Sequence, residues 1–138
     1  MQCASGYCYL MTQQSTAPFE TLGGEPTVRR LVENFYRIMD ESPRAATIRA
    51  MHAADLAPMR DKLIDYLVGW LGGPPRYHAR PDAKCIVSAH APFSIGAEES
   101  EQWMECMREA LSETGVSSEL RALIEPAFDR VAKGLRNR

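Results

Sequence analysis

Apolar residues recur at helical spacing along most of this chain, and no other feature of the sequence restricts the fold as much. The first stripe comprises Val28, Leu31, Val32, Phe35 and Met39. This spacing places every member on one face of an amphipathic helix. Similar stripes predict long helices over residues 55–70, 98–114 and 118–136, and shorter ones over 44–50 and 82–90. Since strand-like alternation is absent from the sequence, we expect an all-α domain with four main helices.

Glycine and proline residues separate these segments. They stand at Gly23-Gly24, Ser42-Pro43, Gly72-Gly73-Pro74-Pro75, Ala91-Pro92 and Gly115. Each position is a predicted helix boundary, because proline cannot continue a helix and glycine favours its end. Pro126 falls inside the last helix and predicts a kink or break near residue 122. We expect the buried stripes to include Met59 in the second long helix and Leu123 in the last.

Length and charge narrow the class of protein. The chain has 138 residues and a formal net charge of −2, which suits one domain and argues against a nucleic-acid binder. No apolar run approaches the ~20 residues of a membrane span. The four cysteines, together with a first ten residues that lack the positive region of a secretory signal, predict a reduced, cytoplasmic protein. We expect residues 1–17 to be a disordered N-terminal extension and residues 18–138 to be the folded domain.

The histidines supply the first chemical candidate. The chain has three, and His90 stands at the carboxyl end of a short apolar helix, directly before Ala91-Pro92. A free backbone carbonyl at a helix end can accept a hydrogen bond from one ring N–H and leave the other nitrogen to bind a metal. Haem iron needs one such imidazole on its proximal side. The alternative is a hydrogen-bonded histidine near the core, which this segment alone favours.

Three other side chains carry hydrogen-bond donors. Tyr36 lies in the first long helix, Trp103 in the helix over 98–114, and His52 in the connection between the first two long helices. Together they offer an O–H, an indole N–H and an imidazole N–H. If they met over a bound diatomic molecule, they could donate hydrogen bonds to it. Taken singly, each is more often an ordinary rim or loop residue.

A set of short blocks identifies a family. The blocks are Leu22-Gly23-Gly24, Phe35-Tyr36, Ile48-Arg49-Ala50-Met51-His52, Asp55-Leu56, Gly69-Trp70-Leu71-Gly72-Gly73-Pro74 with Tyr77, His90-Ala91-Pro92-Phe93-Ser94-Ile95-Gly96 and Gln102-Trp103-Met104-Glu105-Cys106-Met107. In order and spacing they resemble the group II truncated haemoglobins, over about residues 19–136. The resemblance implies a truncated globin-like, two-on-two helical sandwich around a haem b pocket.

The resemblance also implies roles for individual residues. His90 matches the proximal iron ligand, Tyr36 and Trp103 the distal hydrogen-bonding pair, and His52 a third distal site. Lys62 and Tyr77 match groups that reach the haem propionates. The expected apolar contacts to haem are Leu63, Leu67, Phe93, Ile95 and Met107. Met59 falls where longer globins carry their distal histidine, and its bulk narrows that entry.

One departure from the family concerns the propionates. Members usually carry Arg-x-Arg-His before the proximal ligand, whereas this chain reads Val87-Ser88-Ala89-His90. Either haem is held less tightly, or another cation compensates. The candidates are Lys62, Arg76, Arg80 and Lys84.

The leading interpretation is a haem protein that reversibly binds O₂, CO, NO or a similar small ligand, with a role in oxygen transport. An extension is the oxidation of NO or the reduction of peroxide, supported by an unknown reductase. We expect a monomer or homodimer. The alternatives are a haem-free helical sensor or interaction module, and a thiol enzyme using Cys85 or Cys106. A zinc site at Cys3 and Cys8 fits no common spacing.

Overall fold

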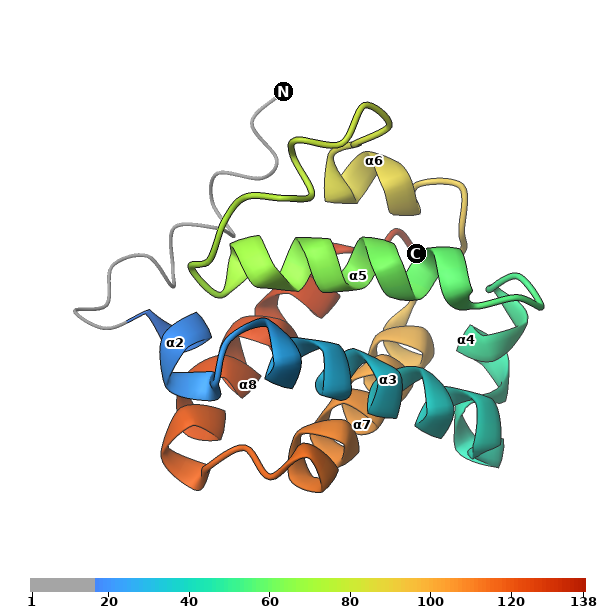
Figure 1. Ribbon diagram of the computed structural model, residues 1–138. Helices are drawn as coiled ribbons and strands as arrows, with labels where there is room; N and C mark the ends of the chain where they lie inside the picture. Colours follow the sequence, from blue (N-terminus) through green and yellow to red (C-terminus); the bar gives the residue numbers. More distant parts are fainter. Residues whose placement is uncertain (1–16) are drawn as a thin grey trace.

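The computed structural model describes residues 17–138, which are helical with no strand (Figure 1). The elements are α2 (Pro18–Leu22), α3 (Glu25–Glu41), the 3-10 turn η1 (Pro43–Ala45), α4 (Ala46–Ala50), α5 (Ala57–Trp70), α6 (Ile86–His90), α7 (Ala97–Thr114) and α8 (Ser118–Gly134). The all-α prediction is confirmed. The expected N-terminal extension lies outside the described residues, apart from Ala17.

The four long helices form two layers. Helices α3 and α5 pack together and lie in front of α7 and α8 in Figure 1. Between the layers, the Trp70 ring of α5 stacks on Phe128 of α8, with centroids 4.5 Å apart and planes at 15°. Phe35 of α3 meets Trp103 of α7 at 5.2 Å. This arrangement confirms the two-on-two sandwich.

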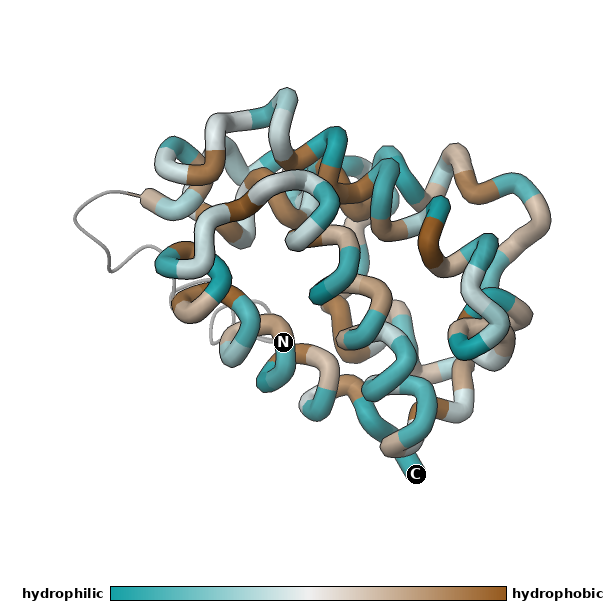
Figure 2. The backbone as a smooth tube through the Cα atoms, turned by 90° about the horizontal axis from the view of Figure 1, so that it is seen from below, coloured by the Kyte–Doolittle hydropathy of each residue, from teal (hydrophilic) through white to brown (hydrophobic). Residues whose placement is uncertain are grey.

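The apolar stripe of α3 forms the centre of the core. Each of its predicted members is fully buried, as are Leu67 of α5 and Met107 of α7. Figure 2 shows hydrophobic and hydrophilic residues interleaved along the helices, as expected where one face packs inward and the other meets water. Among residues 17–138, no helix is long and apolar enough to cross a membrane.

Two predicted core residues lie outside the core. Met59 of α5 is 41% exposed and Leu123 of α8 is 38% exposed. In α5 the inward face consists of Ile64, Leu67, Val68 and Trp70, so Met59 lies beyond its edge. In α8, Ile124 and Phe128 fill the positions against the core and Leu123 turns outward. Apolar spacing alone did not decide which edge of each stripe is buried.

The predicted break in α8 does not occur, because the helix runs from Ser118 to Gly134 through Pro126. Proline lacks the N–H that would bond to the carbonyl four residues earlier, at Ala122. Both Ala122 and Pro126 are exposed, so water can satisfy that carbonyl. The cost of proline is therefore small enough for the packed face of α8 to keep the helix continuous through Pro126.

Helix ends lie within two residues of the predicted boundaries, with one larger shift. Gly23 and Gly115 end α2 and α7 with φ of 120° and 84°, a left-handed conformation that glycine adopts without strain. Helix α6 begins at Ile86 rather than near residue 82. The Tyr77 hydroxyl explains this, because it accepts from the backbone N–H of Lys84 and donates to its carbonyl, which holds the preceding residues in a turn.

Candidate functional site

The His90 ring at the end of α6 is oriented by its own helix. Its Nδ1 lies 2.7 Å from the carbonyl oxygen of Ile86. Since a carbonyl oxygen only accepts, Nδ1 must carry the proton, and in the neutral ring Nε2 holds a lone pair. Within residues 17–138, no hydrogen bond engages that Nε2. A neutral imidazole with one nitrogen anchored and the other free is the donor that a metal requires.

The surroundings of α6 fit a flat apolar group. None of the five residues of α6 is buried, although three of them are apolar. Val87 is 38% exposed and Phe93, just beyond the helix, is 40% exposed. Exposed apolar residues beside an imidazole with a free nitrogen match the needs of haem, which combines a hydrophobic ring with an iron atom. The residues present therefore fit the group that the resemblance implies.

The rings of Tyr36 and His52 lie side by side. Tyr36 is 4% exposed on α3, and its ring lies 5.9 Å from the ring of His52. Its hydroxyl makes no hydrogen bond to any residue of the described chain. Burial raises the pKa of Tyr36 above its ordinary value, and the charge of Arg60 opposes this only in part. The hydroxyl therefore remains a protonated donor available to a ligand.

His52 is anchored in the same way as His90. Its Nδ1 lies 2.7 Å from the carbonyl oxygen of Ile48, so this nitrogen carries the proton. Burial lowers the pKa of His52, and the charge of Arg49 lowers it further, against the bond to Ile48. The ring is therefore neutral near pH 7 and presents a lone pair at Nε2. The sequence suggested an N–H donor here, whereas this tautomer offers an acceptor.

Trp103 is connected to Tyr36 through the ring of Phe35. It is half-buried on α7, with its ring 5.2 Å from Phe35 and 5.7 Å from Phe128. The indole N–H makes no hydrogen bond within the described chain. Phe35 in turn contacts Tyr36 at 5.0 Å. The structure thus brings Tyr36 and His52 into direct contact and connects Trp103 to them by way of Phe35.

The apolar residues predicted to contact haem differ in burial. Leu67, Ile95 and Met107 are buried, and Leu63 is half-buried against the core. Phe93 is exposed on the segment after α6. Their contact with haem stays a prediction, since all five are compatible with walls of an apolar pocket.

The four candidate propionate partners differ in whether they already form an ion pair. Lys62 pairs with Asp82 at 3.6 Å and Arg80 with Asp65 at 2.8 Å, while Arg76 pairs with Glu25. In the part of the chain that the structure describes, the Lys84 ammonium has no acidic partner. It is therefore the cation most available to a carboxylate among the four. The Tyr77 hydroxyl would have to break its hydrogen bonds to the Lys84 backbone before it could donate to a propionate.

Sequence reasoning missed Arg60. This half-buried residue of α5 has no ion pair within residues 17–138, and its charge acts on Tyr36. The available signal was its position directly after Met59, at the start of a mostly apolar helix facing α3. An unpaired guanidinium near a buried hydroxyl adds positive potential to the site.

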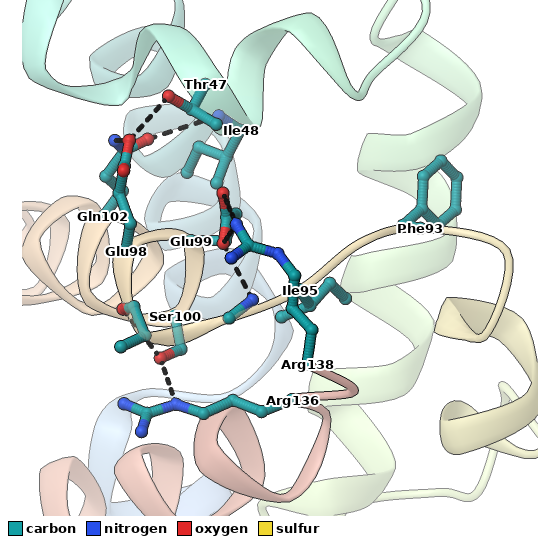
Figure 3. A network of polar contacts seen from close by, with 12 residues as sticks. Thr47, Ile48, Phe93, Ile95, Glu98, Glu99, Ser100, Gln102, Arg136 and Arg138 are labelled. Carbon is teal, nitrogen blue, oxygen red and sulfur yellow. Dashed lines mark hydrogen bonds and ion pairs between the residues drawn. The ribbon is translucent and has the colours of Figure 1, made fainter.

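A polar network fixes the backbone around both histidines (Figure 3). On the His52 side, the Ile48 N–H donates to Gln102 Oε1 at 3.3 Å and the Thr47 hydroxyl donates to Glu98 at 3.0 Å. These bonds attach α4 to α7. Since the Ile48 carbonyl holds His52, α7 indirectly sets the position of that ring.

On the His90 side, the C-terminal residues hold the segment that follows α6. Asn137 donates to the Phe93 carbonyl at 2.7 Å and accepts from the Ile95 N–H at 2.8 Å. Arg138 donates to both carboxylate oxygens of buried Glu99 at 2.9 Å, as Figure 3 shows. The segment leading away from the proximal candidate is thereby tied to α7 and to the end of the chain.

The only free cysteine in the described residues is buried. Cys106 is 3% exposed on α7, and burial raises the pKa of its thiol to about 11. A nucleophilic cysteine needs a lowered pKa and access to substrate. Cys106 has neither property, and Cys85 is disulfide-bonded, so neither residue supports the thiol-enzyme alternative. The reduced state that the sequence predicted is therefore wrong for Cys85.

Comparison with known proteins now decides the family. A family model described as bacterial-like globin matches residues 17–137. The group II 2-on-2 haemoglobin from the plant pathogen Agrobacterium tumefaciens is 38% identical, with a TM-score of 0.81, over 92% of this chain and 98% of its own. The chain belongs to the group II truncated haemoglobins.

Other truncated haemoglobins agree with this assignment. The cold-adapted truncated haemoglobin from the Antarctic marine bacterium Pseudoalteromonas haloplanktis TAC125 has a TM-score of 0.85 at 31% identity, over 89% of this chain and 99% of its own. The group 2 truncated haemoglobin YjbI of Bacillus subtilis (strain 168) is 28% identical over 127 residues, 92% of this chain and 93% of its own. As a truncated haemoglobin, this chain is a globin-type haem protein.

Proposed function

We propose that this truncated haemoglobin reversibly binds O₂, CO, NO and similar small ligands at haem b iron held by His90. The orientation of His90 carries the proposal: Nδ1 is anchored to the Ile86 carbonyl at 2.7 Å and Nε2 is left with a free lone pair. A relative supports the ligand class, since a structure from Bacillus subtilis, 28% identical to this chain, is described as an oxygen-avid truncated haemoglobin.

The chain's own residues provide binding and orientation. When bound, haem supplies an iron atom that accepts one protein nitrogen and one small ligand. His90 supplies the nitrogen, and the Tyr36 hydroxyl and the Trp103 indole N–H supply unengaged donors to the ligand. Leu63, Leu67, Phe93, Ile95 and Met107 exclude water around the ring, and Lys62, Tyr77 and Lys84 are the candidates to meet its carboxylates.

Redox chemistry is an extension of the same proposal. Oxidation of NO by bound oxygen, or reduction of peroxide, consumes electrons on each turnover and therefore needs a reductase as partner. We expect this chemistry in the cytoplasm, in a monomer or homodimer. The competing proposal is a haem-free helical sensor or interaction module, which the missing arginines before His90 favour.

Optical spectra of the ferric, ferrous and CO-bound forms test the proposal. The wild-type chain loaded with haem should give a Soret band that shifts on reduction and on addition of CO. His90→Ala should lose the spectrum of an imidazole-ligated iron and regain it with added imidazole. His78→Ala is the control for loss of an exposed histidine, one whose ring contacts Tyr77 at 5.4 Å. A spectrum that is unchanged in His90→Ala, or no Soret band in the wild type, would favour the haem-free alternative.

A further inference from the structure

The side-chain amide of Asn137 bonds to the segment between α6 and α7 through both of its polar atoms. Its Nδ2 donates to the Phe93 carbonyl at 2.7 Å, and its Oδ1 accepts from the Ile95 N–H at 2.8 Å. Its backbone N–H donates to the Ile95 carbonyl at 2.7 Å. Since a carbonyl only accepts and an N–H only donates, a single orientation of the amide satisfies both partners. A carboxylate of the same shape would lack the donor to Phe93.

Both neighbours of this amide along the chain are fixed to the start of α7 (Figure 3). Arg138 donates to both oxygens of the buried Glu99 carboxylate at 2.9 Å. Its guanidinium lies against the backbone of Gly96, where an added Cβ would come within 2.9 Å of it. On the other side, Arg136 donates to the Ser100 hydroxyl at 2.7 Å. The amide is therefore placed by anchored residues on each side of it.

Helix α6 buries none of its own residues, although it carries His90 at its end. Its position therefore depends on the segments that flank it. Before the helix, the Tyr77 hydroxyl holds the Lys84 backbone. After it, the His90 carbonyl accepts from the Phe93 N–H at 3.1 Å, and the Phe93 carbonyl accepts from Asn137. Two hydrogen bonds thus connect the backbone of His90 with the Asn137 amide.

We propose that Asn137 is a positioning residue for the proximal ligand. By holding Phe93 it fixes where α6 ends, and so how firmly Nε2 of His90 is held toward the haem iron. Groups that orient a metal ligand from outside typically change metal affinity by about 10- to 100-fold. The donor to the Phe93 carbonyl is the Asn137 contact closest to His90 along the chain. The inference rests on the proposed function, because it requires haem iron bound at His90.

Asn137→Asp tests this role by exchanging the amide nitrogen for an oxygen. The variant keeps the acceptor for Ile95 and turns an oxygen toward the Phe93 carbonyl in place of the donor. Haem should pass to excess apomyoglobin about tenfold faster than from wild type. The iron–histidine stretching band in the resonance Raman spectrum of the ferrous protein should move to lower frequency, because His90 is held less firmly.

Asn34→Asp is the matched control. Asn34 of α3 donates through the same kind of amide to the Thr114 hydroxyl at 3.0 Å. The substitution removes that donor and adds the same charge, so thermal melting should show a similar loss of stability. Since Thr114 ends α7 whereas the proximal segment meets its start, haem loss and the iron–histidine band should match wild type. If Asn137 had only a structural role, the two variants would behave alike, which would overturn the inference.

Hydrogen exchange followed by NMR gives a measurement that does not depend on haem. Asn137→Ala removes both side-chain bonds without adding charge, so the Ile95 amide should exchange about tenfold faster. Asn137→Ala should also repeat the Raman shift, which covers the case in which Asn137→Asp does not fold. Unchanged exchange, or faster exchange with an unchanged iron–histidine band, would overturn the inference alone. If the wild type gave no Soret band with haem, the proposed function itself would fail, and this inference with it.

Discussion

At the scale of single residues, His52 and His90 share one local geometry and differ in their neighbours. Each follows an isoleucine by four positions, and each donates its Nδ1–H to that isoleucine's carbonyl at 2.7 Å. The helix end therefore determines the tautomer, because a free backbone carbonyl there accepts a hydrogen bond from Nδ1 of the ring. What differs is the neighbour of the remaining nitrogen: His52 lies against Tyr36, whereas His90 ends a helix with no buried residue.

Tyr36 provides a prediction at this scale. Tyr36→Phe removes an unengaged hydroxyl and leaves the ring in place, so O₂ should dissociate about 10- to 150-fold faster, as loss of a charge-assisted hydrogen bond of about 1.5–3 kcal/mol implies. Stopped-flow measurement of the O₂ dissociation rate checks this. CO is the control ligand, since it carries less negative charge and its rate should change far less. Equal rates of O₂ release from wild type and variant would place the hydroxyl outside ligand binding.

At the scale of elements, the start of α7 connects both sides of the site. Glu99 accepts from the Gly96 N–H at 2.8 Å and from Arg138 at 2.9 Å, while Gln102 and Glu98 hold α4. The carboxylate also interacts favourably with the positive end of the helix dipole. One helix terminus therefore positions the segment after His90 and the turn before His52.

Acidic pH should destabilise the N-terminus of α7. The Gly96 N–H, foremost, and Arg138 hold the pKa of Glu99 below its ordinary value. A carboxyl whose folded pKa is lowered stabilises the fold above its unfolded pKa of about 4.3, and this stability is lost as pH falls through the folded value. Between about pH 5 and pH 3, thermal melting should therefore show a smaller fall in Tm for Glu99→Gln than for wild type.

The variant also allows a matched comparison near neutral pH. There Glu99→Gln should melt several degrees below wild type, because an amide loses the charge that pairs with Arg138. Glu101→Gln, an exposed residue in the same helix, should melt within about a degree of wild type. Parallel pH profiles for wild type and Glu99→Gln would show that this carboxyl does not couple pH to stability.

At the scale of the whole molecule, aromatic contacts join the two layers. Phe128 of α8 is 3% exposed and touches both tryptophans, Trp70 at 4.5 Å and Trp103 at 5.7 Å. These contacts connect Trp70, in the centre of the core, with the half-buried Trp103. The packing that holds the sandwich together is thus continuous with the packing that places Trp103.

Phe128→Leu tests this continuity. The unfolding free energy should fall by about 2 kcal/mol, between the costs of a volume-conserving swap and of truncation to alanine. Urea unfolding followed by tryptophan fluorescence and by circular dichroism should still give one coincident transition, since both layers share the core. Leu123→Ala, exposed on the same helix, should cost less than about 0.5 kcal/mol. Two separate transitions would mean that the layers unfold independently.

The helices were largely predictable because burial of an amphipathic stripe is a local property. The α3 stripe, the glycine ends at Gly23 and Gly115, and the order of the elements all follow from spacing and backbone preference. The exposure of Met59 and Leu123 was not predictable, since apolar residues at the edge of a stripe are buried only if another element covers them. The unbroken course through Pro126 likewise depends on which face of α8 packs inward.

The candidate site, too, was predictable only in part. By itself, the sequence identified the family and the candidates His90, Tyr36, His52 and Trp103, because their blocks recur in fixed order and spacing. Only the tertiary structure decided that Tyr36 and His52 touch, that Lys84 lacks an acidic partner in the described chain and that Arg60 acts on Tyr36. The physical reason is distance along the chain: a residue's type and local helix position are encoded nearby, whereas its partners are set by the packing of remote helices.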